Sequence, residues 1–179
     1  MAHCCFVVQN QNIMTFTESF LNELKQEAVT TRKMLERVPA DLFHWQPHQK
    51  SMTLKQLATH VAELPTWINL VINTKELDFA TNPYQPVPLS TEQELLAYFE
   101  QALTEGQQTL ANATDEQLTD RWVLRSGETI YSNELKRDFL RQCFCQVVHH
   151  RAQLGVYLRL LDIPIPGSYG PSADEQNFN

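Results

Sequence analysis

Four stretches of the sequence place apolar residues every three or four positions, and this pattern limits the fold more than any other feature. They cover residues 16–38, 53–71, 90–110 and 133–161. The spacing puts apolar side chains on one face of a helix, and such a face is stable when it packs against other helices. We therefore predict an all-α protein whose four long helices form a four-helix bundle.

The segments between these helices carry signals of their own. Capping-box spacings precede the second and third helices, at Thr53–Gln56 and Ser90–Gln93. Three prolines between residues 75 and 89 predict a long crossover loop. Two short runs, 122–124 and 129–131, flank a turn sequence and could pair briefly as strands. The expected topology is thus a helical bundle with one long crossover.

The composition is that of a single globular domain. The chain has 179 residues, of which 42% are hydrophobic and 20% are charged. Its net charge of -7 opposes binding to phosphate backbones, so we expect no nucleic-acid partner. Residues 1–13 resemble neither a signal peptide nor a membrane span, and we interpret them as an extension before one domain over residues 14–179. The four cysteines suggest no disulfide framework, which favours a cytoplasmic protein without membrane partners.

The last helix contains two neighbouring histidines that point in different directions. At about 100° per residue, His150 lies on the apolar face, His149 lies at its flank, and Gln146 lies close to the core. In the second helix, His60 shares the apolar stripe, and Pro65 is expected to interrupt the helix beside it. A buried histidine commonly needs only a hydrogen-bond partner, but two that face inward from different helices also suit a metal ion.

Two segments of the sequence resemble the DinB-like family of DNA-damage-inducible proteins, within the DinB/YfiT-like superfamily of metalloenzymes. They are PHQKSMTLKQLATHVAELPTW and HHRAQLGVYLRLLDIPIPGSYGPSADE, and the likeness extends over residues 14–175. The resemblance implies an up-up-down-down four-helix bundle that forms a homodimer and holds nickel or zinc with three histidines. It assigns two of these ligands to His60 and His150, whereas the third position is Gln146 in this chain.

Gln146 departs from the family's three-histidine pattern. Its amide oxygen is a hard, neutral donor that transition metals hold less well than an imidazole, so we expect weaker metal binding. His44 and His48, in the connection before the second helix, are alternative third ligands. His149 and Cys145 stand four residues apart but are predicted to face outward, which makes them a poor replacement.

Other side chains near this region have mainly structural interpretations. We expect Arg151 to pair with Glu63 or with a helix-end carbonyl, and Cys143 to pack in the core. The tail after the last helix is expected to wrap the bundle surface, with Tyr169 and Asp174 as candidates to cover the mouth of the site.

The resemblance implies metal-dependent chemistry on a small molecule, such as transfer of a low-molecular-weight thiol to an electrophile, or hydrolysis. A divalent ion would lower the pKa of a bound water or thiol and so give a nucleophile near neutral pH. The alternative is a non-catalytic, stress-related dimeric bundle that has lost its metal together with the third histidine.

Overall fold

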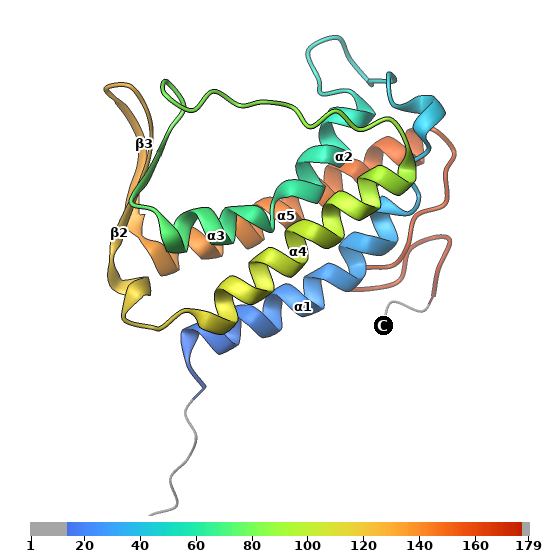
Figure 1. Ribbon diagram of the computed structural model, residues 1–179. Helices are drawn as coiled ribbons and strands as arrows, with labels where there is room; N and C mark the ends of the chain where they lie inside the picture. Colours follow the sequence, from blue (N-terminus) through green and yellow to red (C-terminus); the bar gives the residue numbers. More distant parts are fainter. Residues whose placement is uncertain (1–13, 177–179) are drawn as a thin grey trace, which may run out of the picture.

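The computed structural model describes residues 14–176, which fold into five α-helices and a small three-stranded sheet (Figure 1). In chain order the elements are α1 (Phe16–Leu35), α2 (Leu54–Glu63), α3 (Thr66–Asn73), β1 (Glu76–Asp78), α4 (Glu92–Asn112), β2 (Arg121–Ser126), β3 (Thr129–Leu135) and α5 (Lys136–Leu160). The prediction of a mostly helical fold is confirmed, but the all-α class does not include the three-stranded sheet, of which only a brief pairing of two strands was predicted. The extension predicted over residues 1–13 lies outside the described residues.

The helices pack along one another's length in two opposite directions (Figure 1). α1 and α5 run the same way, because Phe20 stacks on Phe144 and, further along both helices, Thr31 bonds Arg151. α2, α3 and α4 run the other way, since the long crossover after α3 returns the chain to the end at which α2 begins. The predicted up-up-down-down order is therefore not confirmed, and the chain runs up-down-down-up.

Side-chain caps fix where the helices start. Capping boxes open α1 at Thr15, α2 at Thr53 and α4 at Thr91. The Thr53 box was predicted, whereas the box predicted at Ser90 lies one residue later. The Glu94 carboxylate accepts hydrogen bonds from the backbone N–H groups of both Ser90 and Thr91, and this places Thr91 at the cap.

Pro65 separates α2 from α3, as the sequence predicted. Its ring nitrogen cannot donate the next helical hydrogen bond, so α2 ends at Glu63 and α3 begins at Thr66. α4 packs closely against this break through Gly106, whose position leaves no room for a side chain. A Cβ atom there would lie 2.9 Å from the Pro65 carbonyl oxygen.

Gly106→Ala is expected to destabilise the protein by about 1–3 kcal/mol, because backbone atoms of α3 and α4 must move apart to admit the methyl group. Urea denaturation measures this change in the free energy of unfolding. Gly170→Ala is the matched control, since a Cβ at Gly170 meets no atom within 4 Å. Equal stability of the two variants would contradict the close packing at Pro65.

The sheet has the order β1-β2-β3, with β1 parallel to β2 and β2 antiparallel to β3. The two runs predicted to pair do lie in one antiparallel hairpin, but their register differs from the prediction: residues 122–124 pair with 132–134, whereas 129 and 130 pair with 126 and 125. β1 was not predicted: its segment was interpreted as part of the crossover loop. Gly127 has a φ of 56° in the β2–β3 turn, a conformation that glycine adopts readily.

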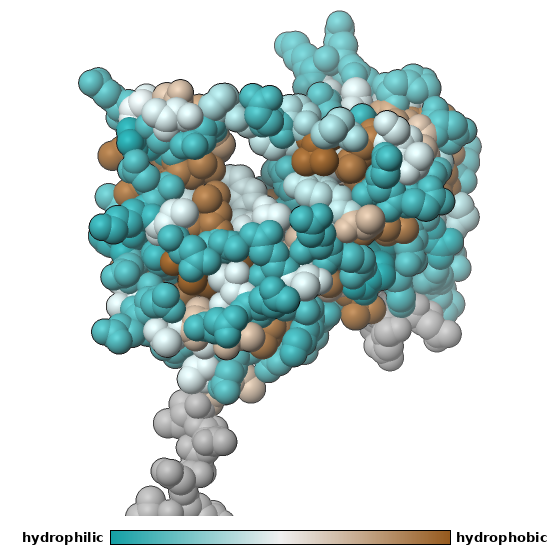
Figure 2. Space-filling view, viewed as in Figure 1, coloured by the Kyte–Doolittle hydropathy of each residue, from teal (hydrophilic) through white to brown (hydrophobic). Residues whose placement is uncertain are grey.

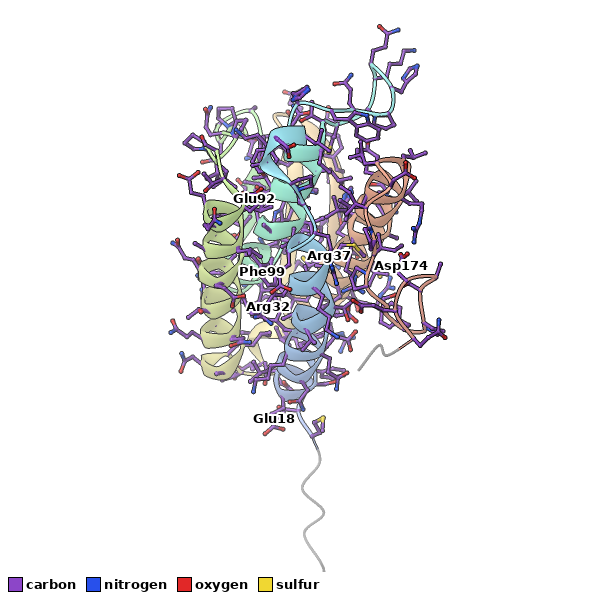
Figure 3. The ribbon with its side chains drawn as sticks, turned by 90° about the vertical axis from the view of Figure 1, so that its right-hand side faces the viewer. Glu18, Arg32, Arg37, Glu92, Phe99 and Asp174 are labelled. Carbon is purple, nitrogen blue, oxygen red and sulfur yellow. The ribbon has the colours of Figure 1, made fainter. Side chains whose placement is uncertain are left out.

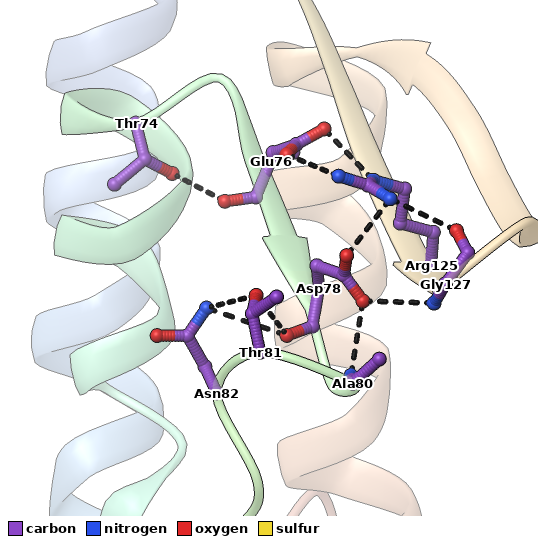
Figure 4. A network of polar contacts seen from close by, with 8 residues as sticks. All are labelled: Thr74, Glu76, Asp78, Ala80, Thr81, Asn82, Arg125 and Gly127. Carbon is purple, nitrogen blue, oxygen red and sulfur yellow. Dashed lines mark hydrogen bonds and ion pairs between the residues drawn. The ribbon is translucent and has the colours of Figure 1, made fainter.

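Asp78 joins the start of the crossover to this hairpin (Figure 4). Its carboxylate accepts hydrogen bonds of 2.9 Å from the backbone N–H groups of Gly127 and Ala80, and it pairs with Arg125 at 2.8 Å. The two backbone hydrogen bonds, aided by Arg125, lower the pKa of Asp78. Arg125 also binds Glu76 through two nitrogens. The crossover is thus anchored at the sheet before it returns to α4.

A single core fills the space between the helices and continues under the sheet. Its largest fully buried side chains include Trp122, Phe99, Leu35, Leu54, Ile68 and Leu154. At its edge, Arg32 of α1 lies over the Phe99 ring and binds Glu100 of α4 (Figure 3).

Among residues 14–176, no helix combines the length and the apolar character needed to cross a membrane.

Candidate metal and small-molecule site

His60 of α2 and His150 of α5 meet at the interface between these helices. Their ring centroids lie 4.5 Å apart, and the ring planes are inclined by 75°. Each ring is partly buried. The structure therefore brings together the two histidines that the sequence predicted to face inward.

Each of these rings is held by the side chain three residues further along its own helix. His60 Nδ1 lies 2.6 Å from a Glu63 carboxylate oxygen, and His150 Nδ1 lies 2.9 Å from the Gln153 amide oxygen. An imidazole that donates from Nδ1 has its lone pair on Nε2. A carboxylate or amide behind the ring is the usual support of a metal-binding histidine. Both rings are thus prepared to bind a ligand through Nε2.

The surroundings favour the neutral form of His150. Burial lowers its pKa, and this outweighs the opposite effect of the Gln153 hydrogen bond. His60 and His149 add a smaller contribution in the same direction as burial. A neutral imidazole is the form that binds metal ions.

The prediction that Gln146 lies close to the core was wrong, because its side chain is exposed on α5. It nevertheless lines a cavity of about 230 Å³ together with His60. Within the described part of the chain, no group of three or more His, Cys, Asp or Glu side chains is arranged to hold a metal. Gln146 offers an amide oxygen as a third donor on the side of this cavity.

The other candidate ligands lie less favourably. His44 and His48 are exposed, and His48 Nδ1 accepts a hydrogen bond from the Lys50 backbone. His149 is exposed, as predicted, although its ring lies 4.8 Å from that of His150. Cys143 is buried, as predicted, and burial raises the pKa of its thiol to about 12. Cys143 is therefore a poor nucleophile at neutral pH.

A larger cavity of about 460 Å³ opens on the other side of His60, between α2 and the crossover. α2 contributes Lys55, Thr59 and Glu63 to its wall, and the crossover contributes Phe79 and Val87. Figure 2 shows the molecule hollowed beneath the crossover, with hydrophobic side chains beside the hollow. Volume and lining are typical of a site for a small molecule.

Glu63 and Tyr84 belong to this site, although neither was predicted from the sequence as a site residue. Tyr84 of the crossover donates a hydrogen bond of 3.1 Å to the Glu63 oxygen that does not contact His60. Burial, together with the Glu63 charge, raises the pKa of Tyr84 to about 12. The three-residue spacing of His60 and Glu63 could have indicated their contact. No sequence signal places Tyr84, because its position depends on the path of the crossover.

Arg151 faces away from the histidines, and its predicted pairing with Glu63 was wrong. Its guanidinium is buried against α1, where it pairs with Glu27 at 2.6 Å and donates to Thr31 at 3.0 Å. Tyr169 of the tail accepts a hydrogen bond from Arg151 and donates one to Glu27. The tail therefore packs over α1 and α5.

Asp174 does not cover the histidine site either. It binds Arg159, which is exposed on α5. In Figure 3, Asp174 is drawn on the same side of the molecule as Arg37, which follows the end of α1. The prediction that Tyr169 and Asp174 cover the mouth of the site was therefore wrong.

Fold and site together define a mostly helical protein with two facing imidazoles beside a small-molecule cavity. The sequence model of the DinB family matches residues 10–177, and the chain belongs to this family. Its sequence is similar to that of YrdA, an uncharacterized protein of Bacillus subtilis strain 168. The two are 27% identical over 158 residues, which are 88% of this chain and 90% of YrdA.

Two crystal structures of DinB-like proteins show the same fold. One, from Bacillus cereus ATCC 10987, has a TM-score of 0.67 and 21% identity over 85% of this chain and 97% of its own. The other, YjoA from Bacillus subtilis, has a TM-score of 0.63 and 16% identity over 89% of this chain and 99% of its own. At these identities the likeness establishes the fold alone.

Proposed function

We propose that this chain is a divalent-metal-dependent enzyme of the DinB family that acts on a small molecule. In this proposal His60, His150 and Gln146 hold nickel or zinc. The supporting observation is that two imidazoles from different helices meet with both Nδ1 atoms already engaged. The donor set fits a metal ion with two imidazoles, a weaker amide oxygen, and positions left for water or substrate.

A bound divalent ion supplies Lewis acidity, which makes a water or thiol a better nucleophile near neutral pH. The residues of the chain have supporting roles. Glu63 and Gln153 orient the two rings, and Tyr84 holds Glu63 in place. The largely apolar wall of the larger cavity offers a surface against which the apolar part of a substrate can pack. The proposed reaction is transfer of a low-molecular-weight thiol to an electrophile, or hydrolysis.

Metal analysis of protein purified without a histidine tag tests this proposal. After incubation with nickel or zinc and dialysis, the wild type is expected to retain one ion per chain, and His60→Ala and His150→Ala are expected to lose it. His149→Ala is the control, because this exposed histidine lies outside the proposed donor set. Circular dichroism checks that each variant is folded. A wild type that retains neither metal would contradict the proposal.

A second candidate is a non-catalytic dimeric bundle that has lost its metal. It is favoured by Gln146 at the position of a family ligand and by the lack, in residues 14–176, of a three-residue His, Cys, Asp or Glu cluster.

For either candidate we also propose that the protein is cytoplasmic and forms a homodimer. Each subunit would be a four-helix bundle in which α2 and α3 together count as one helix. Light scattering measures the oligomeric state, and a monomer would contradict the dimer.

A further inference from the structure

The larger cavity has a distribution of charge that selects for one kind of ligand. Lys55, Thr59 and Glu63 follow one another at four-residue spacing, so they lie along one face of α2 and form the floor of the cavity. Eight residues of helix separate the two charged side chains by about 12 Å. The cavity therefore has a cationic end at Lys55 and an acidic end at Glu63.

The two charged groups differ in what they are free to bind. One oxygen of the Glu63 carboxylate contacts His60, and the other accepts a hydrogen bond from Tyr84. The Lys55 ammonium forms no ion pair with any residue from 14 to 176. An anionic group in the cavity is consequently attracted to Lys55 and repelled from Glu63.

The wall between these ends is largely apolar. Met52 precedes α2, Trp67 belongs to α3, and Phe79, Pro86 and Val87 come from the crossover. Such a wall binds an aromatic or aliphatic body through burial of apolar surface. A polar, multiply charged ligand would leave its charges without partners along most of this wall.

We infer that the larger cavity binds a small apolar carboxylic acid, with the carboxylate at Lys55 and the apolar body directed along α2 toward His60. As the substrate class of the proposed enzyme, this inference rests on the proposed function. The binding itself needs no metal. It can therefore be measured on protein freed of metal by EDTA.

Isothermal titration calorimetry with a matched pair of probes tests the inference. Naphthalene-2-carboxylate and naphthalene-2-carboxamide have nearly the same shape and differ in charge. The metal-free wild type is expected to bind one carboxylate per chain, about fivefold more tightly than the carboxamide. Lys55→Met is expected to remove this preference and to change carboxamide affinity by less than about twofold.

Two further variants control for general effects. Lys50→Met removes an exposed lysine that does not line the cavity, and it is expected to keep the preference for the carboxylate. Val87→Asp places a charge in the apolar wall, and it is expected to weaken binding of both probes.

The inference is overturned if the wild type binds neither probe, if it binds the carboxamide as tightly as the carboxylate, or if Lys55→Met keeps the preference. These outcomes are independent of the metal test. A chain that binds the carboxylate but retains no metal would contradict the proposed function, and the acid would then be a ligand of the cavity and not the substrate of a metal-dependent enzyme.

Discussion

Gln146→His is expected to increase the affinity for nickel or zinc by on the order of 100-fold. The substitution replaces a neutral amide oxygen with an imidazole at the position where the family resemblance predicts a third histidine. Gln146 lines the same small cavity as His60, so an imidazole there can approach an ion held by His60 and His150. Competition with a chromogenic chelator measures the dissociation constant.

Two further variants separate a completed site from nonspecific binding to an added histidine. Gln108→His adds an imidazole to an exposed position of α4, where it is expected to leave the affinity unchanged. The double variant Gln146→His/His60→Ala is expected to lose most of the gain. If Gln146→His binds metal no better than the wild type, Gln146 is not a ligand position.

Arg151→Met is expected to destabilise the protein by about 3–5 kcal/mol, because it leaves the Glu27 carboxylate buried without its cation. The side chains of Arg151 and Glu27 are only 3% and 10% exposed. Arg151 forms the sole close ion pair of Glu27 among the described residues, and Tyr169 supplies one hydrogen bond to the carboxylate. Urea denaturation followed by circular dichroism measures the free energy of unfolding.

The matched control is Arg159→Met, which breaks the exposed pair with Asp174 on the same helix. The Arg159 side chain is 44% exposed, so the expected cost is below about 1 kcal/mol. The double variant Glu27→Met/Arg151→Met removes both charges, and it is expected to recover much of the lost stability. If Arg151→Met and Arg159→Met lower the free energy of unfolding by similar amounts, the buried ion pair contributes no more to stability than the exposed one.

Helical periodicity was sufficient to predict the main helices of the fold and the two inward-facing histidines of the site. It located the main helices, and the chemistry of Pro65 predicted the break between α2 and α3. It also selected His60 and His150 over His149, because an apolar stripe fixes the direction of a side chain relative to its own helix. The contact between the two rings follows once α2 and α5 are neighbours.

Periodicity does not indicate which neighbour a buried face meets, and the errors follow from this. Arg151 was predicted to pair with Glu63 on α2 or with a helix-end carbonyl, yet its partner is Glu27 on α1. β1 has only three residues, too few for a pattern, and it is held by pairing with β2 and by Asp78. Tyr84 reaches Glu63 only because the crossover follows this route.

The parallel pairing of β1 with β2 has a consequence for the order of folding. It joins Glu76 to Val123, and all of α4 lies between them in the chain. Closing so long a loop costs conformational entropy before the contacts between β1 and β2 form and offset that cost. The pairing of β1 with β2 is therefore slow. Helices can form from local contacts, whereas the crossover wall of the cavity depends on this distant pairing. We therefore expect the capacity to bind a small molecule to arise late in folding, after most of the helical structure.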